Sequence, residues 1–430
     1  MERREFIKVS AAASAALLLD WEKAFAAGKT DPQVGKAWKG WKKGHFQVHF
    51  IYTGVAESMF MIFPDGTSML LDCGDHNAIG RGKLAVPVLP DGSRHAGEWI
   101  ARYVQRVNPA GCHVDYMMLS HYHNDHGGGE TFFADKVERD GQDYYLAGFS
   151  QAAEFLDFDR AFDRCYPEFL DPIPLLDDGA LMRTHMTKFY DYMRKHRGLQ
   201  VEKFRVGETD QIALRNDRSR YPDFSVFNLC GNGRIAAPDG QIIDLYAARK
   251  QNPPQRFNEN GMSLGMVFTY GAFRFYTAGD FSDSWRLPDG TVFYTEEAIA
   301  DVCGPAHVTK INHHGHNSMP AKLVSALRSQ VYVSCVWDQL HNLAHVMDTL
   351  ADRSLYPGER VFCPGIFPAE RREEDKGKPW LADIEPAAFE GGHVVLDVPQ
   401  GGSTFSIAYL TAADESMTVR SVLNFTTRQL

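Results

Sequence analysis

The decapeptide SHYHNDHGGG at residues 120–129 carries four side chains of the types that bind metal ions: His121, His123, Asp125 and His126. It follows a short apolar run that is typical of a β-strand ending in a loop. Because residues i and i+2 of an extended chain point the same way, His121 and His123 can bind one ion. Asp125 and His126 lie on the other side of the loop and can begin a second site. Imidazole and carboxylate groups suit zinc and similar divalent cations, so this loop predicts a metal centre.

Two later segments place the same chemistry directly after apolar strands. Asp280 follows the run at residues 273–278. His313 and His314 follow the run at residues 308–311. A carboxylate can bridge two cations that lie ~3.5–4 Å apart, which is the role we expect for Asp280. Neighbouring residues of an extended chain point in opposite directions, so we expect only one of His313 and His314 to bind metal directly.

The hydrophobic pattern of the chain indicates a layered α/β structure. Strand patterns cover residues 45–53, 57–63 and 68–71, and a helical pattern covers residues 97–107. Hairpins followed by mixed strands and helices are typical of sheets with helices on their outer faces. Residues 130–205 are rich in aromatic and charged side chains at helical spacing, so we interpret them as a helical insertion.

Two further predictions concern the aromatic residues of the insertion and the C-terminal part of the chain. The aromatic residues of the insertion form either a small helical core or a wall of a substrate pocket: Phe132, Phe133, Tyr144, Tyr145, Phe149, Phe155, Phe158 and Phe162. Within residues 356–430, a Pro- and charge-rich stretch to residue 386 is predicted to be irregular, and antiparallel strands follow as a C-terminal β extension.

The motifs together resemble those of the metallo-β-lactamase superfamily of metal-dependent hydrolases. Asp72 in the stretch LLDCG matches the aspartate of its first motif, and residues 121–126 match its H-x-H-x-D-H motif. Within the superfamily, NGMSL at residues 260–264, TAGD at 277–280 and HHG at 313–315 resemble one branch. That branch contains the extracytoplasmic domain of bacterial DNA-uptake (competence) channel proteins and is similar to secreted phosphorylcholine esterases.

The resemblance implies an αββα four-layer sandwich over residues 44–355, with two zinc ions per chain and manganese or iron as alternatives. His121 and His123 should bind one ion. Asp125, His126 and His314 should bind the other, with Asp280 between the two. Asp72 is expected to support the histidine loop by hydrogen bonding.

Three positions depart from the family pattern. Many members supply a third histidine to the first zinc, but the interval between His126 and Asp280 offers only His185 and His196, in the insertion. His316 stands where the branch has serine after His-His-Gly, and Ala344-His345-Val346 is the nearest match to a later Gly-His-Pro. His341 and His345 are four residues apart and could share a helix face near the site.

The expected mechanism needs no nucleophilic side chain. Two divalent cations lower the pKa of a bridging water to ~7, and the resulting hydroxide attacks phosphorus or a carbonyl carbon. We expect Asp125, His313 and His345 to take part in catalysis, with His316 as a further donor to the developing negative oxygen. A phosphodiesterase acting on a small diester is the leading hypothesis. A lactonase or β-lactam hydrolase would use the same ligands, and a non-catalytic metal-binding protein is a third reading.

Composition narrows the partners. The chain has 430 residues, a formal net charge of −10 and 44% hydrophobic residues, which excludes a disordered or low-complexity protein. No apolar run reaches the ~18–20 residues that a membrane span needs, so we expect none in the mature chain. An acidic body is poorly suited to long nucleic acids, so a small-molecule substrate is expected.

The first residues have the pattern of an export signal. Residues 1–26 contain RREFIK at positions 3–8, then a short Ala-rich apolar run and an Ala-Phe-Ala cleavage pattern. The paired arginines resemble a bacterial twin-arginine signal, which implies the twin-arginine export machinery as a partner and a periplasmic or secreted product. Residues 27–43 carry five lysines against one aspartate and are interpreted as a basic linker.

Overall fold

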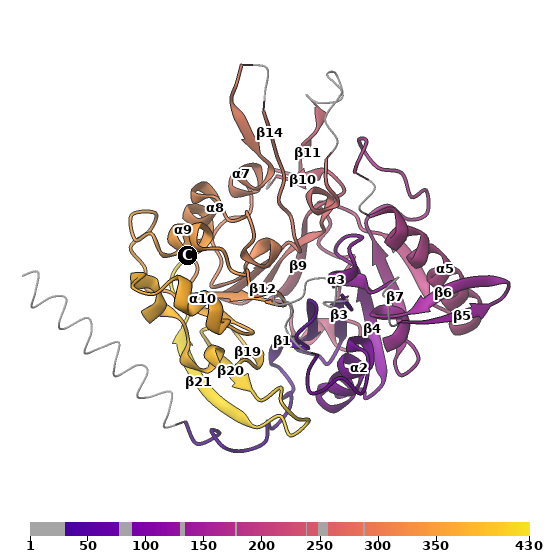
Figure 1. The fold of residues 1–430 in the computed structure, drawn as a ribbon, viewed down its shortest axis with the longest axis horizontal. Coiled ribbons are helices and arrows are strands. Elements are labelled where there is room, and N and C mark those ends of the chain that lie inside the picture. The colour runs from indigo at the N-terminus through magenta and orange to yellow at the C-terminus, as the bar shows by residue number, and fades with distance from the viewer. Residues whose placement is uncertain are drawn as a thin grey trace, which may run out of the picture.

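Two large β-sheets form the centre of the molecule (Figure 1). The computed structural model describes residues 31–76, 88–129, 134–176, 179–237, 239–247, 257–286 and 289–430. The first sheet has nine strands, which lie in the spatial order β21 (Val419–Thr426), β20 (Thr404–Leu410), β19 (His393–Val398), β1 (Phe46–Phe50), β2 (Ser58–Ile62), β3 (Ser68–Cys73), β4 (His113–Met118), β7 (Asp157–Asp163) and β8 (Gln200–Lys203).

The second sheet has eight strands, in the order β11 (Ile242–Asp244), β10 (Arg234–Ala236), β9 (Phe224–Gly231), β12 (Gly265–Tyr270), β13 (Phe273–Thr277), β16 (Val308–Lys310), β17 (Val331–Ser334) and β18 (Val361–Pro364). Two separate hairpins pair β5 (Asp135–Arg139) with β6 (Gln142–Leu146), and β14 (Ser284–Arg286) with β15 (Val292–Tyr294).

Strand alternation explains why the two sheets pack face to face. Phe46 and Phe50 of β1 point into the space between the sheets, where they contact Phe268 of β12 and Phe275 of β13. His49 lies on the opposite face of β1, because successive side chains alternate. All five residues of β1 are buried, so both faces of the first sheet are covered.

Helices cover the outer faces of both sheets, so the molecule has the predicted four layers (Figure 1). The first sheet is covered by α2 (Ala96–Val107), α4 (Phe149–Ala152) and α5 (Ala180–Arg197), and the second by α7 (Thr295–Ala300), α8 (Ala321–Leu327) and α9 (Ala344–Ala351). The remaining helices are short: α3 (Asn124–Gly127), α10 (Ala369–Glu374), and the 3-10 turns η2 (Arg218–Arg220), η3 (Glu259–Met262), η4 (Asn312–Gly315), η5 (Pro379–Asp383) and η6 (Pro386–Phe389). No helix in the described ranges is long and apolar enough to cross a membrane.

Two predicted segments, the helical insertion and the C-terminal strands, contribute strands to the first sheet. The stretch predicted as a helical insertion contains α4 and α5, but its strands β7 and β8 also extend the first sheet, because β7 pairs in parallel with β4 and β8 pairs in parallel with β7. The β7 sequence DFDRAFD alternates charge with apolar residues too irregularly to signal a strand, and pairing with β4 decides its conformation. The C-terminal strands are likewise integral, because β19 pairs with β1 in the first sheet.

The structure describes part of the predicted N-terminal linker but none of the predicted signal. The predicted signal at residues 1–26 lies outside the described residues. Residues 31–43 of the predicted linker run beside β21, where the Gly35 N–H donates to the Val419 carbonyl over 2.8 Å.

Strand direction gathers the loops that carry chemistry. β3 and β4 are parallel, and β13, β16 and β17 are parallel in the second sheet. The carboxyl ends of parallel strands meet at one edge of a sheet. Asp72 near the end of β3, the decapeptide after β4, Asp280 after β13 and His314 after β16 therefore come together.

Candidate metal centre

The first pair of predicted ligands converges in the loop after β4. The Nε2 atom of His121 lies 3.1 Å from the Nδ1 atom of His123, and their ring centroids are 4.7 Å apart. His121 is fully buried, and His123 is partly exposed. Two nitrogen atoms at this separation can bind one zinc ion, because each bond measures about 2.0–2.1 Å. The structure thus brings His121 and His123 together as the spacing predicts.

A second group of donor atoms lies beside the first. Asp280 Oδ2 is 3.2 Å from His126 Nε2 and 3.1 Å from His314 Nε2. Asp125 Oδ2 is 3.1 Å from His314 Nε2 and 3.7 Å from His126 Nε2. All four side chains are buried. The rings of His121 and His126 are 4.2 Å apart, so the two groups adjoin. This cluster is compatible with a site for two metal ions.

Asp72 holds the histidine loop in place through contacts with Ser120 and His126. Its Oδ1 accepts a hydrogen bond from the Ser120 N–H over 2.7 Å, and its Oδ2 lies 2.7 Å from Ser120 Oγ and 2.8 Å from His126 Nδ1. A proton on His126 Nδ1 leaves Nε2 with its lone pair toward the cluster. Asp72 adopts a left-handed backbone, with φ of 59°, that few non-glycine residues tolerate. The expected supporting role of Asp72 therefore has a direct geometric basis.

His314 is oriented in the same way from the second sheet. Its Nδ1 atom lies 2.7 Å from the Cys335 carbonyl oxygen at the end of β17, so its Nε2 atom faces Asp280 and Asp125. The indole N–H of Trp337 also donates to His314 Nε2 over 3.2 Å. A cation bound by His314 would replace this hydrogen bond, which makes Trp337 a natural reporter of metal binding.

The turn η4 decides which of the two adjacent histidines joins the cluster. His313 and His314 both have left-handed φ angles, 49° and 52°, so the chain turns sharply here instead of running extended. His314 reaches the cluster, whereas His313 Nδ1 lies 2.9 Å from Ser282 Oγ and His313 Nε2 lies 3.1 Å from Asn260 Nδ2. Burial lowers the pKa of His313 to about 4, so its ring is neutral.

Sequence reasoning missed a buried ion pair under the cluster, between Glu57 and Lys310. The Lys310 ammonium lies 2.8 Å from Glu57 Oε2, 3.6 Å from Asp280 Oδ1 and 2.7 Å from the Gly279 carbonyl oxygen. Both side chains are fully buried. Glu57, His126, Asp280 and His314 form a group whose ligand atoms lie within 4.8 Å of one another. A lysine inside the apolar run at residues 308–311 was the available signal.

Glu57 acts on the cluster from the far side of the His314 ring. Its Oε2 atom is 3.3 Å from His314 Nδ1, whereas Asp280 and Asp125 face His314 Nε2. Burial raises the pKa of Glu57, and Lys310 opposes that shift. Although Glu57 could supply a ligand atom, this position and its pairing with Lys310 fit a residue that orients His314.

The electrostatics of the cluster favour bound positive charge. Burial by itself lowers the pKa of His126, but the carboxylates of Asp280, Asp125 and Asp72 outweigh burial and raise it well above the usual value. His314 behaves alike: burial opposes the shift, and Asp280 and Asp125 raise its pKa to about 9. The carboxylates that favour protonation of these two buried imidazoles would also favour a divalent cation, because both bring positive charge into the cluster.

The hydrogen bonding of His126 is a second observation that is compatible with a bound metal ion. His126 Nε2 is buried and makes no hydrogen bond of good geometry within the described part of the chain. A nitrogen aimed at carboxylates, with its Nδ1 already engaged, is suited to a cation. The donor set, imidazole and carboxylate, is of the kind that binds divalent metal ions.

Other predicted residues lie near the cluster or apart from it. His341 is buried and stacks on His314 with ring centroids 5.0 Å apart, but it precedes α9, so it shares no helix face with His345. His345 is exposed in the first turn of α9, and no described ring or hydrogen-bond contact joins its imidazole to the cluster. The half-buried His316 lies 5.2 Å from the ring of His313.

The insertion supplies no ligand among its described residues. His185 packs against Tyr144, and His196 pairs with Asp140. Tyr144, Phe149 and Phe158 are buried in the core between the first sheet and its helices. These residues therefore form core, although Tyr144 also lines a small pocket together with Tyr145. Phe132 and Phe133 lie outside the described residues.

A second group of metal-ligand type lies elsewhere, formed by His113, Asp115 and Asp159. The Arg215 guanidinium is 2.7 Å from Asp159 and 3.6 Å from Asp115. Although these residues could bind an ion, Arg215 already supplies positive charge to both carboxylates, so this group is the weaker candidate.

Two comparisons with known proteins found no match. No protein-family model matches the chain. No curated protein matches it either. The site is thus defined by its geometry alone.

Proposed function

We propose that this protein is an exported hydrolase of the metallo-β-lactamase type that uses two zinc ions to cleave small phosphodiesters. One observation carries the proposal: six predicted ligand side chains from three separate segments meet, with donor atoms at 3.1–3.7 Å in two adjoining groups. The α/β sandwich places those segments at one edge of its sheets.

Each residue has an assigned part in this proposal. His121 and His123 would hold one zinc, and Asp125, His126 and His314 the other, with Asp280 shared. Zinc ions there, with manganese or iron as alternatives, would supply a water of lowered pKa as the nucleophile and positive charge beside the scissile bond.

The protein's own groups keep that site ready for substrate. Lys310 contacts Oδ1 of Asp280, which leaves Oδ2 directed at His126 and His314. His313 lies beside the Asn260 amide, and we assign this pair to holding a substrate oxygen. In this proposal Asp125 helps to orient the attacking water. His345 is exposed on α9, so it can donate only to a substrate that extends to this helix.

One observation favours a phosphodiester over a cyclic amide or ester, and a second favours a small phosphodiester over a long nucleic acid. His313, His316 and His341 gather around His314, and a phosphodiester presents two non-bridging oxygens that need donors, whereas a lactam or lactone develops one oxyanion. The net charge of −10 disfavours a long nucleic acid, because such partners need a basic surface.

The test is a substrate panel with zinc-loaded, full-length protein. We expect turnover of bis(4-nitrophenyl) phosphate or a phosphocholine aryl ester, loss of turnover in His121→Ala, and normal turnover in the matched control His113→Ala. Hydrolysis of a cephalosporin or an acyl-homoserine lactone with no diester cleavage would replace the phosphodiesterase assignment. If no substrate is cleaved although two zinc ions bind, the non-catalytic alternative stands.

Export rests on the first residues of the sequence. The twin-arginine motif at positions 3–8 motivates a periplasmic or secreted location. Changing both arginines to lysine keeps the charge but removes the recognised pair. We expect the double variant to stay unprocessed inside the cell, and undiminished export would contradict this route.

A further inference from the structure

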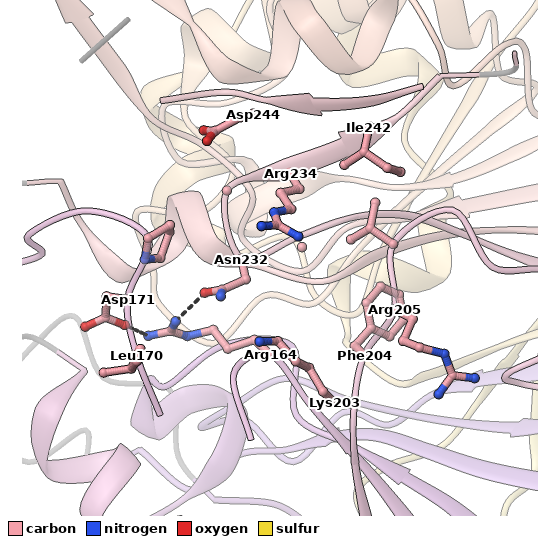
Figure 2. A pocket seen from close by; sticks show the side chains of 14 residues that line it. Arg164, Leu170, Asp171, Lys203, Phe204, Arg205, Asn232, Arg234, Ile242 and Asp244 are labelled. Carbon is pink, nitrogen blue, oxygen red and sulfur yellow. Dashed lines mark hydrogen bonds and ion pairs between the residues drawn. The ribbon is translucent and has the colours of Figure 1, made fainter. Parts of the chain in front are cut away.

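A pocket of about 490 Å³ lies between the segments that follow β7 and β8 and the turn from β9 to β10 (Figure 2). Its volume falls in the range of about 300–1,000 Å³ that is usual for small-molecule sites. None of the predicted metal ligands lines it. The pocket is therefore a separate feature that the proposed hydrolytic site does not explain.

The charge of this pocket runs against that of the whole protein. Among its lining residues are four cations and two carboxylates: Arg164, Lys203, Arg205, Arg234, Asp171 and Asp244. The complete chain carries a net charge of −10. Three of these cations, Arg164, Lys203 and Arg205, already form ion pairs with carboxylates. The positive charge available to an anion in this pocket therefore comes mainly from Arg234.

The cations differ in how far they are already engaged. Arg164 is buried and satisfied, with its guanidinium bonded to Asn232 over 2.6 Å and to Asp171 over 2.7 Å, as the dashed lines in Figure 2 mark. Lys203 is half exposed and lies 3.5 Å from Glu168. Arg234 is exposed on β10 and has no hydrogen-bond or ion-pair partner among the described residues. Arg234 is therefore the cation best placed to receive an anion.

The pocket also has an apolar wall that water contacts at present. Leu170 is 70% exposed and Ile242 is 42% exposed, whereas Phe204, which also lines the pocket, is buried. Both exposed side chains appear with Arg234 in Figure 2. Covering exposed apolar surface is favourable, so a ligand with an apolar body gains from this wall.

From these features we infer that the pocket binds a small amphipathic anion, in which a carboxylate, phosphate or sulfonate group is attached to an apolar body. The anionic group meets Arg234 with support from Lys203, and the apolar body covers Leu170 and Ile242. This inference goes beyond the proposed hydrolase and does not depend on it.

The pocket is joined to the metal loop by one buried ion pair. Arg164 Nε donates to Glu259 over 2.6 Å, and the same Glu259 oxygen accepts the Tyr122 N–H over 3.0 Å, between His121 and His123. The experiment must therefore separate binding in the pocket from binding at the metal centre.

The probe is 2-naphthalenesulfonate, an aromatic anion whose sulfonate is a weak zinc ligand, titrated calorimetrically into zinc-loaded full-length protein. We expect one site per chain with a Kd of about 1 mM or tighter. Arg234→Ser should weaken binding about fivefold, as for a partly exposed ion pair, and Arg234→Lys should retain most of it. The matched control Arg218→Ser removes an equally exposed arginine outside the pocket and should leave binding unchanged.

Three results would overturn the inference. The first is no saturable binding to wild-type protein. The second is equal weakening in Arg234→Ser and Arg218→Ser, which would show a general charge effect. The third is loss of binding in His121→Ala with full binding in Arg234→Ser, which would place the anion at the metal centre. Failure of the hydrolase assay leaves these outcomes unaffected, because they measure binding.

Discussion

Replacing Lys310 by methionine removes the buried ammonium that lies between Glu57 and Asp280. The change keeps an unbranched side chain of similar length, so it alters charge more than volume. It leaves Glu57 Oε2 without its partner at 2.8 Å and Asp280 Oδ1 without the cation at 3.6 Å. Both carboxylates stay buried, because the surrounding strands do not change.

The size of the effect follows from these distances. At an effective dielectric constant of about 20, two unit charges 2.8 Å apart attract by about 6 kcal/mol. Part of that attraction offsets the cost of taking both ions out of water. Breaking a buried pair by removing one partner costs about 3–5 kcal/mol, because the remaining charge is stranded. We therefore expect Lys310→Met to lower the free energy of unfolding by about 3–5 kcal/mol in metal-free protein.

The assay is urea unfolding of Lys310→Met, Glu57→Gln and the double variant, followed by tryptophan fluorescence. The double variant removes the stranded carboxylate as well as the ammonium. Its loss should be smaller than the sum of the two single losses by at least about 1 kcal/mol, since the residues are in contact. Zinc should stabilise Lys310→Met more than it stabilises wild type, because bound cations replace the missing positive charge.

Two outcomes would refute this reasoning. A loss below about 1 kcal/mol for Lys310→Met would mean that the ammonium does not hold the two carboxylates. Single losses that add up in the double variant would mean that Glu57 and Lys310 do not interact. Either result would also remove the assigned role of Lys310 in orienting Asp280.

Three further predictions use other parts of the fold. Burial raises the pKa of Glu296 from 4.5 to about 8, so wild type loses stability as pH rises between these values. The Tm of Glu296→Gln should therefore exceed that of wild type by more at pH 8 than at pH 5. A Tm difference that is the same at both pH values would contradict the raised pKa. Burial lowers the pKa of His185 to about 4, and neither ring nitrogen has a hydrogen-bond partner among the described residues, so wild type loses stability as pH falls below 6.5. His185→Leu should raise the Tm, more at pH 5 than at pH 7.5. A Cβ at Gly315 would lie 2.4–2.9 Å from the Asn342 side chain, so Gly315→Ala should lower the Tm and also the zinc content, which mass spectrometry measures. Gly377→Ala, where a Cβ has nothing within 4 Å, should leave the zinc content unchanged.

Much of the candidate site could be predicted because its information is local. The spacing of His121 and His123 fixes their relative direction, and the structure places their nitrogens 3.1 Å apart. The Asp280 and His314 segments were recognisable because each follows an apolar strand, and strand ends are where a sheet presents side chains. The alternation of β1 likewise predicts which of its residues enter the core.

Local patterns were insufficient wherever pairing between distant segments decides the outcome. The β7 segment carries four charges in seven residues, and only parallel pairing with β4 makes it a strand of the first sheet. The choice between His313 and His314 depended on η4, whose two left-handed residues contradict the extended chain assumed from the sequence.

The amino-acid sequence by itself determined the kind of chemistry that this protein can carry, because ligand type and short spacing are properties of one segment. Only the tertiary structure decided how the segments complete one another. Glu57 and Lys310 are far apart in the chain; Glu57 stands at the edge of one apolar run, and Lys310 lies inside another. Packing of the two sheets brings them to 2.8 Å under the cluster. Burial then gives that pair its importance, since a charge removed from water requires a partner at close range.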